Sequence, residues 1–232
     1  MAKYKEIVYM VLDDLHQYSD DQNITAGHII FLAGRYRSFL LKQRYYQDLK
    51  KEIPESNYQT LCLTLEKTEA IEGLPCEGGY YVRTKEEIPT TLPVGTTRLS
   101  TSGSFYKSEI AFITRDRMKY VGYNKWLRNI IYASLSSDGR IYLISNNPQF
   151  LYLDGGDLQV TGIFEDPEAV SQYECKNDSE EENCDIMERE FPIEDSLIAP
   201  MIELIVKHLS PSVAAPEDEK NDANDSLSHP NG

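Results

Sequence analysis

Histidine is scarce in this sequence, and the four that occur stand in unrelated surroundings. His16 and His28 fall in two segments with helical periodicity, His208 closes a third, and His229 lies in a polar tail. A nucleophilic hydrolase needs a base beside its serine or cysteine, and no Gly-x-Ser-x-Gly elbow accompanies these histidines. The Walker and Gly-x-Gly-x-x-Gly patterns are also missing. We therefore expect no catalytic residues and no cofactor, and predict that the chain is not an enzyme.

A long apolar run is absent as well. Nowhere do about 18 apolar residues follow one another, as a membrane-spanning helix requires. The charged start, residues 1–6, lacks the apolar core of a signal peptide. We expect no membrane partner and folding in a cytoplasm. In that setting the four cysteines are expected to be thiols rather than a disulfide framework; they are Cys62, Cys76, Cys175 and Cys184.

Paired cysteines and histidines at the short spacing of zinc sites are also lacking. Cys175 and Cys184 lie among acidic residues, but no second pair accompanies them. The stretch does offer candidate ligands for calcium, because carboxylates bind hard cations; they are Asp178, Glu180, Glu181 and Glu182. The stretch lacks the alternating ligand spacing of an EF-hand, so a solvated acidic loop without metal is favoured.

The charge of the chain is concentrated at one end. From Glu165 to the C-terminus there are nineteen acidic and four basic residues, which account for the whole net charge of −15. Residues 1–164 are therefore neutral. Tight wrapping of nucleic acid needs clustered Lys and Arg, so this distribution argues against it.

The first fifty residues have helical periodicity. Residues 3–18 place one apolar face at spacings of three and four: Tyr4, Ile7, Val8, Val11, Leu15 and Tyr18. After a polar break, Thr25 predicts the N-cap of a second helix, which ends before Pro54. Its apolar stripe is predicted to contain Ile29, Leu32, Tyr36, Phe39 and Tyr46, with Arg35, Arg37, Lys42 and Arg44 on its solvated edges.

The middle of the chain alternates with a period of two, which predicts strands over 58–66, 80–84, 110–114, 119–123, 130–135 and 140–144. Asp138-Gly139 predicts a hairpin, and a second hairpin is expected to pair 150–153 with 158–163. Cys62 is expected to be a buried small hydrophobe. Residues 86–104 are rich in Pro, Thr, Ser and Gly and are predicted to be a flexible linker.

The C-terminal third predicts a short helix over 165–175, an acidic loop and a last helix with Pro200 near its first position. Its stripe contains Ile202, Ile205, Val206 and Leu209. The order of helices, sheet and helix gives an α+β fold. The predicted division is a helical hairpin over 1–54, a small antiparallel β domain over 55–164, a C-terminal helical region over 165–209 and a disordered acidic tail over 210–232.

Two segments are candidate contact surfaces. The helix over 25–51 mixes basic residues with tyrosine, which favours contact with a partner's acidic surface; a nucleic-acid-binding module using this helix is the alternative. Residues 119–132 hold the only tryptophan among several tyrosines, and such residues are enriched both in interfaces and in sheets. The candidate assembly residues are Arg35, Arg37, Lys42, Arg44, Tyr120, Tyr123, Trp126 and Arg128.

Several of these segments resemble virion structural proteins of crAss-like phages, which infect gut Bacteroidales. The resemblance lies in residues 53–60, 119–132, 147–153, 161–167 and 191–207, and it extends from about Ile7 to Leu209. These are packing and turn motifs rather than catalytic ones. The sequence is most similar to the ring proteins of the neck, in particular to the portal-proximal head-to-tail adaptor.

The resemblance implies a homo-oligomeric ring, a dodecamer matched to the portal, with a helical bundle beside a β domain. The implied location is the neck of the virion at the portal vertex, after synthesis in the host cytoplasm. The implied partners are other copies of the chain, the phage portal protein and further ring or tail neck proteins. Genomic DNA is expected to pass through the ring without specific binding.

The uneven charge is compatible with a ring. A closed ring needs a heterologous interface, in which two different patches of one protomer meet. Basic helix edges and an acidic C-terminal third would supply two dissimilar surfaces, and such complementarity favours register and association rate.

Overall fold

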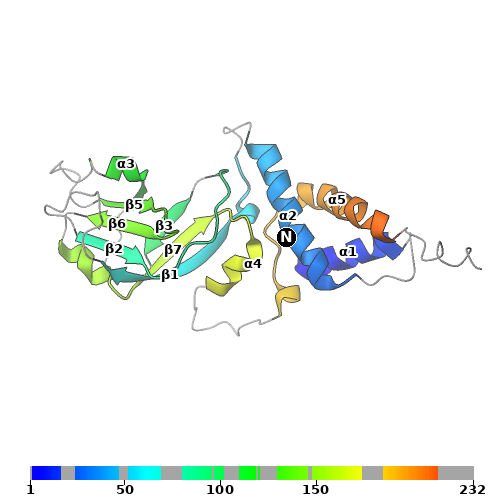
Figure 1. The fold of residues 1–232 in the computed structure, drawn as a ribbon, viewed down its shortest axis with the longest axis horizontal. Helices are drawn as coiled ribbons and strands as arrows, with labels where there is room; N and C mark the ends of the chain where they lie inside the picture. The colour runs from blue at the N-terminus through cyan, green and yellow to red at the C-terminus, as the bar shows by residue number, and fades with distance from the viewer. Residues whose placement is uncertain are drawn as a thin grey trace, which may run out of the picture.

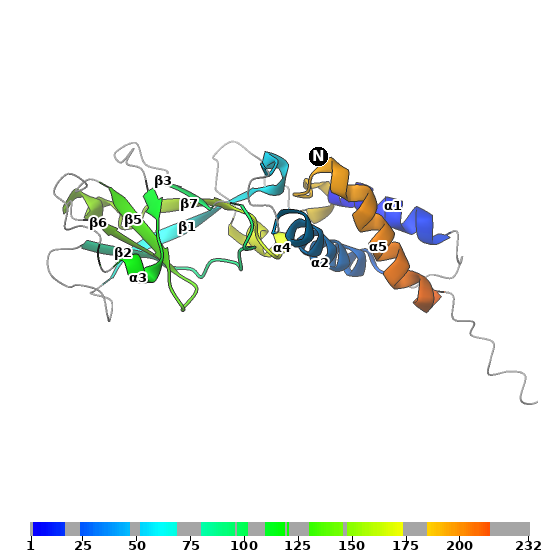
Figure 2. The ribbon, with the colours of Figure 1, turned by 90° about the horizontal axis from the view of Figure 1, so that it is seen from above.

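The computed structural model describes residues 2–16, 24–46, 52–68, 80–95, 97–101, 110–118, 120, 130–145, 148–173 and 185–213. The molecule is elongated, with three helices at one end and a curled sheet at the other (Figures 1 and 2). The predicted α+β class is confirmed. Helix α2 lies between the sheet and the other two long helices (Figure 1).

Helix α1 (Tyr4–His16) buries the face that its periodicity predicts, from Tyr4 to Leu15. Tyr18, the last residue predicted for that face, lies outside the described residues. The helix start is tied to a short 3-10 helix, η5 (Ile186–Glu188). The side chains of Lys3 and Lys5 form ion pairs with Glu188 at N···O distances of 3.1 and 2.6 Å.

Helix α2 (Ala26–Tyr45) begins at the predicted cap, where the Thr25 side chain accepts a hydrogen bond from the backbone N–H of His28 at 3.3 Å. Its predicted apolar stripe is partly wrong. Phe39 and Tyr46 are 54% and 63% exposed, whereas Leu41 and its neighbours Leu40 and Tyr45 are buried. The reason is that α2 contacts helices on one side and residues 164–167 on another, so its buried arc is wide and displaced from the predicted stripe.

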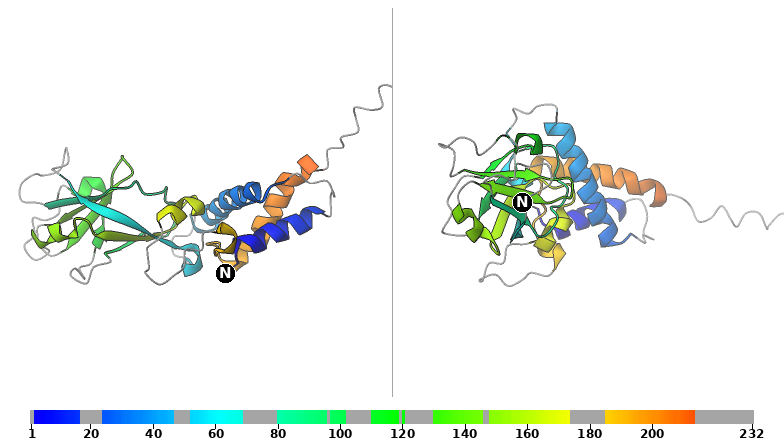
Figure 3. Two further views of the ribbon diagram at one scale, coloured as in Figure 1. Left: turned by 90° about the horizontal axis from the view of Figure 1, so that it is seen from below. Right: turned by 60° about the vertical axis from the view of Figure 1, so that its left-hand side comes forward.

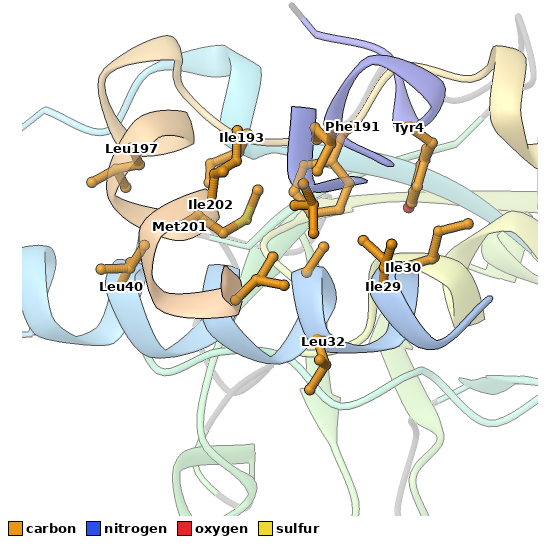
Figure 4. Close-up of a cluster of buried hydrophobic side chains, with 14 of the residues drawn as sticks. Tyr4, Ile29, Ile30, Leu32, Leu40, Phe191, Ile193, Leu197, Met201 and Ile202 are labelled. Atoms are coloured by element: carbon orange, nitrogen blue, oxygen red, sulfur yellow. The ribbon is translucent and has the colours of Figure 1, made fainter. Parts of the chain in front are cut away.

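Helix α5 (Asp195–Val213) begins five residues before Pro200, so the prediction that Pro200 stands near its first position is wrong. Pro200 lies on the exposed side, while Leu197 and Met201 are buried above Leu40 of α2 (Figure 4). Burial of these side chains extends the helix toward its N-terminus. The helix also continues through residues 210–213, which the sequence assigned to the tail; residues 214–232 lie outside the described residues.

The three long helices share one hydrophobic core, and Figure 3 shows them side by side from below. α1 and α5 both pack on α2 and on each other. The segment before α5 adds Phe191 and Ile193, which are fully buried (Figure 4). The ring of Phe191 meets that of Tyr4 edge to face at a centroid distance of 4.9 Å. The last helix thus completes the core of the first two.

The sheet has seven strands in the order β3-β7-β1-β2-β6-β5-β4. Their bounds are β1 (Gln59–Lys67), β2 (Tyr80–Thr84), β3 (Arg98–Thr101), β4 (Ile110–Phe112), β5 (Ile131–Leu135), β6 (Ile141–Ser145) and β7 (Asp157–Gly162). The pair β4–β5 is parallel, so the expectation of a purely antiparallel sheet is wrong. Parallel neighbours need a crossover connection, and the short helix α3 (Arg115–Met118) lies in it. The outer strands β3 and β4 contact each other, which makes the sheet a nearly closed barrel.

Strand β1 shows how the alternating pattern fills this barrel. Leu61 and Leu63 face the interior opposite Val160 and Leu158 of β7. Cys62 points to the other side, where it is half-buried and disulfide-bonded. The expectation of a buried thiol at this position is therefore wrong.

One of the two predicted hairpins is present. Gly139, with φ of +74°, turns the chain between β5 and β6 as Asp138-Gly139 predicts. The second is wrong, because residues 148–153 form the 3-10 helix η3 (Pro148–Leu153) and β7 pairs with β1 and β3 instead. Pro148 suits a helix start, since its φ is preset and its missing N–H costs nothing there. The side chain of Phe150 lies in the barrel core and is fully buried.

The predicted flexible linker over 86–104 is also corrected by the structure. It contains β3, and its residues Leu92 and Val94 are buried in the core of the helices. Backbone hydrogen bonds of 2.8 Å join Leu92 N–H to the Ile163 carbonyl and Glu165 N–H to the Thr90 carbonyl. The segment is thus attached to both ends of the molecule.

The remaining elements are short. η1 (Glu55–Asn57) precedes β1. The helix predicted over 165–175 is present as α4 (Pro167–Val170) continued by η4 (Ser171–Tyr173). The candidate calcium ligands of the acidic loop lie outside the described residues.

Gly95 gives a direct test of how the segment 86–104 packs against the rest of the chain. Its φ is +76°, and an added Cβ would lie 2.8 Å from the Tyr58 hydroxyl and 3.2 Å from Ile163 Cδ1. We expect Gly95→Ala to lower the free energy of unfolding by about 1–3 kcal/mol, measured by urea denaturation. Gly27→Ala, where the new methyl meets nothing within 4 Å, is the control and should be neutral or stabilising. Equal effects of the two substitutions would contradict the packing.

Candidate assembly surfaces

Arg37 lies at the centre of the junction between the helices and the barrel, with no exposed surface. Its guanidinium donates to three backbone carbonyls: Pro192 through Nε, Phe164 through Nη1 at 2.8 Å, and Asn57 through Nη2 at 3.0 Å. Burial lowers the pKa of Arg37 to about 10, which still leaves the side chain charged at neutral pH. The expectation that Arg37 lies on a solvated helix edge is wrong, since it joins α2 to three other segments.

A second polar group of the same junction is Glu194, whose side chain is also buried. Its carboxylate accepts a hydrogen bond of 2.6 Å from the Tyr45 hydroxyl and pairs with Arg44 at 3.0 Å. Its backbone N–H donates to Asn57 Oδ1 at 2.9 Å. Burial, together with the bond to Glu194, raises the pKa of Tyr45 to about 12. Sequence patterns did not reveal this network, because its members are far apart along the chain.

The outward side of α2 carries a row of exposed side chains, with one that is partly exposed (Lys42). We call this row the outer stripe: His28, Phe31, Arg35, Phe39, Lys42 and Tyr46. Their spacings of three and four place them on one helix face. Phe31 and Phe39 are 56% and 54% exposed. Arg35 lies with its guanidinium carbon 5.7 Å from the centre of the Phe31 ring. Exposed aromatics beside an arginine are typical of protein interfaces.

The outer stripe borders a groove of about 460 Å³ whose other wall is formed by residues 165–168. Lys42 crosses to Glu165 in an ion pair of 3.0 Å, and the Ser38 hydroxyl donates to the Glu165 carbonyl at 2.6 Å. Gly34 of α2 faces Pro167 across the groove, where an added Cβ would lie 3.4 Å from the proline ring, in van der Waals contact. Burial raises the pKa of Glu168, and the neighbouring Asp166 carboxylate adds to the shift.

A second groove, of about 700 Å³, lies between α1 and α5. We call it the acidic groove because three carboxylates line it, those of Asp13, Asp14 and Glu203, against the single ammonium of Lys207. Its apolar lining comes from Met10, Ile202 and Val206. The groove is not visible in the sequence, because the two helices that form it are far apart along the chain.

The structure separates the predicted assembly residues. Arg35 is exposed on the outer stripe, and Lys42 and Arg44 are partly exposed but ion-paired within the chain. Tyr120 is 78% exposed at the barrel end, beyond α3. Tyr123, Trp126 and Arg128 lie outside the described residues. The basic helix residues and Tyr120 therefore do not form one surface.

The described ranges contain no group of three or more His, Cys, Asp or Glu side chains arranged to hold a metal ion. None of the helices described is both long and apolar enough to cross a membrane. The features that stand out are surfaces suited to contacts between proteins. Such surfaces are expected of a subunit of an assembly.

Comparison with known proteins identifies the assembly. The family described as phage tail ring protein 2 matches residues 6–227. Ring protein 2 of Bacteroides phage crAss001 is 51% identical over 227 residues, which are 97% of each chain. The chain therefore belongs to the phage tail ring protein 2 family of crAss-like phages, as its resemblance predicts. It is a structural component of the phage tail, in a family of structural rather than catalytic proteins.

Proposed function

We propose that the chain forms a closed ring of twelve copies beneath the portal and joins the portal vertex to the tail. Membership of the ring protein family carries this proposal. The two dissimilar grooves of the helical end support it, because a closed ring joins two different patches of each protomer. In this role the portal protein contacts one side of the ring, and further ring or tail neck proteins contact the other.

The same ring forms part of the conduit for the genome. The excess of acidic residues after residue 164 supports this, because carboxylates facing a channel repel phosphates and let duplex DNA slide without sticking.

Nucleic acid binding by α2 is disfavoured, since Arg37 is buried and Lys42 and Arg44 pair with carboxylates of the chain. Of the predicted assembly residues that the structure describes, Arg35 and Tyr120 are exposed and form no ion pair with another described residue, and both are proposed contacts.

The mass of the purified protein, alone and mixed with the portal protein of the same virion, tests the proposal. We expect the mixture to contain a ring of this chain bound to the portal. A protein that stays monomeric with the portal and with every other neck component would contradict the proposal.

A gel-shift series with duplex DNA should show no binding near physiological salt; micromolar binding that weakens steeply with salt would instead support the nucleic-acid-binding alternative.

A further inference from the structure

The outer stripe and the acidic groove are both unoccupied by other described parts of the chain. They also lie on different sides of the same three helices. Figure 1 places α4, beside the outer stripe, on one side of α2, and α1 and α5 on the other. Because both surfaces belong to one packed core, a single copy cannot bring them together. Two copies can.

We propose that the outer stripe of one copy docks in the acidic groove of the next copy, and that repetition of this contact closes the ring. The proposal rests on the function proposed above and names the surfaces that carry it. It is a helix-in-groove contact, in which exposed side chains of one helix enter the space between two others.

The chemistry of the two surfaces is complementary. Arg35 forms no ion pair with any described residue, and the groove offers an excess of carboxylates through Asp13, Asp14 and Glu203. The apolar groups also match, since Phe31 and Phe39 would bury against Met10, Ile202 and Val206, of which Met10 is 47% exposed in the single chain. Burial of exposed aromatics supplies affinity, and the charges set register.

The dimensions allow this contact as well. The outer stripe runs from His28 to Tyr46, and the lining of α5 runs from Ala199 to Ser210. At 1.5 Å per residue the stripe is about 27 Å long and the lining about 17 Å. The stripe is therefore long enough to occupy the whole length of the groove.

Two charge-reversed variants test the contact. The acidic-stripe variant carries His28→Glu and Arg35→Glu; both positions are exposed, and Glu at position 28 suits the third residue after the Thr25 cap. The basic-groove variant carries Asp13→Lys and Asp14→Lys, near the C-terminal end of α1, where cations are favourable. Both variants are therefore expected to fold.

We expect each variant alone to lose ring formation and remain at the monomer mass under conditions in which the unaltered protein forms rings. An equimolar mixture should form rings again, because each stripe then meets a groove of opposite charge, and the two variants should alternate around the ring. The matched control is Lys67→Glu with Lys85→Glu on the barrel, also exposed and also two reversals; it should form rings by itself.

Rings from either variant alone, or a mixture that stays monomeric, would overturn the pairing of stripe and groove while ring formation by the unaltered protein still stands. Rings from the acidic-stripe variant alone are also the result expected if the chain's own acidic C-terminal segment covered the stripe. Failure of the unaltered protein to form rings, even with the portal, would overturn the ring proposal itself.

Discussion

Replacement of Arg37 by methionine is expected to lower the free energy of unfolding by about 3 kcal/mol or more, because three buried carbonyls lose their donors at about 1–3 kcal/mol each. Methionine fills much of the space, so the loss reports on hydrogen bonds rather than on a cavity. Arg37→Lys should also be destabilising, since an ammonium cannot reproduce the planar fork that reaches three carbonyls. Urea denaturation followed by circular dichroism measures both effects.

The matched control is Arg35→Met, two positions earlier on the exposed side of α2. It removes the same group from the surface and should change the stability by less than about 0.5 kcal/mol. If Arg37→Met were as mild as Arg35→Met, the junction would not depend on the buried guanidinium. Since Arg37 joins α2 to the end of β7, its loss should also expose the region around Phe164 to proteolysis.

Replacement of Phe191 by alanine is expected to be the most damaging change in the helical core, with a cost of about 3–5 kcal/mol. The ring is fully buried, packs edge to face on Tyr4 and lies between the chain's first helix and its last (Figure 4). The Phe191 backbone N–H also donates to the Ala2 carbonyl at 2.8 Å. Because this core supports both proposed docking surfaces, the same change should weaken ring formation.

Phe112→Ala provides the comparison for Phe191→Ala. Phe112 lies on the outer strand β4 and is 44% exposed, so its removal should cost less than a third of the loss at Phe191. Thermal and urea denaturation of the two variants measure the difference. Similar losses of stability in the two variants would show that the effect of Phe191→Ala does not come mainly from the packing of Phe191 in the helical core.

The helices show what periodicity predicts and where it fails. α1 was predicted accurately because it is buried on one side only, so its apolar spacing reports its single contact face. α2 contacts neighbours over a wide arc, and its apolar residues are spread around it. Phe39 was therefore placed inside and Arg37 outside, the reverse of what the structure shows. Only tertiary contacts reveal that three carbonyls from distant segments converge on Arg37.

In the sheet, too, local sequence patterns predicted some elements and missed others. Strands with clear alternation, such as β1, were predicted within a residue or two, and the turn at Gly139 followed from its sequence. The four-residue strand β3 was missed, because its segment is rich in Pro, Gly, Ser and Thr and its stability comes from pairing with β7. Residues 150–153 were predicted to be a strand because they are apolar, although Pro148, two residues earlier, favours a helical start.

The candidate assembly surfaces were likewise predicted only where they depend on a single element. The sequence pointed to α2 as a contact element, and the structure retains Arg35 on its exposed face. The acidic groove could not be predicted, because Asp13 and Glu203 are brought together only by the packing of α1 on α5. Charge counting by sequence region placed the acidic surface in the C-terminal third, whereas this groove takes two of its three carboxylates from α1.

The structure of the ring assembled on the portal tests the central claim most directly, which is that copies of this chain join through two different faces of the helical end. We predict that Phe31, Arg35 and Phe39 of each copy lie against α1 and α5 of its neighbour, with Arg35 near Asp13 or Asp14. A ring in which the outer stripe remains exposed to solvent and neighbouring copies meet only through their barrels would contradict the account.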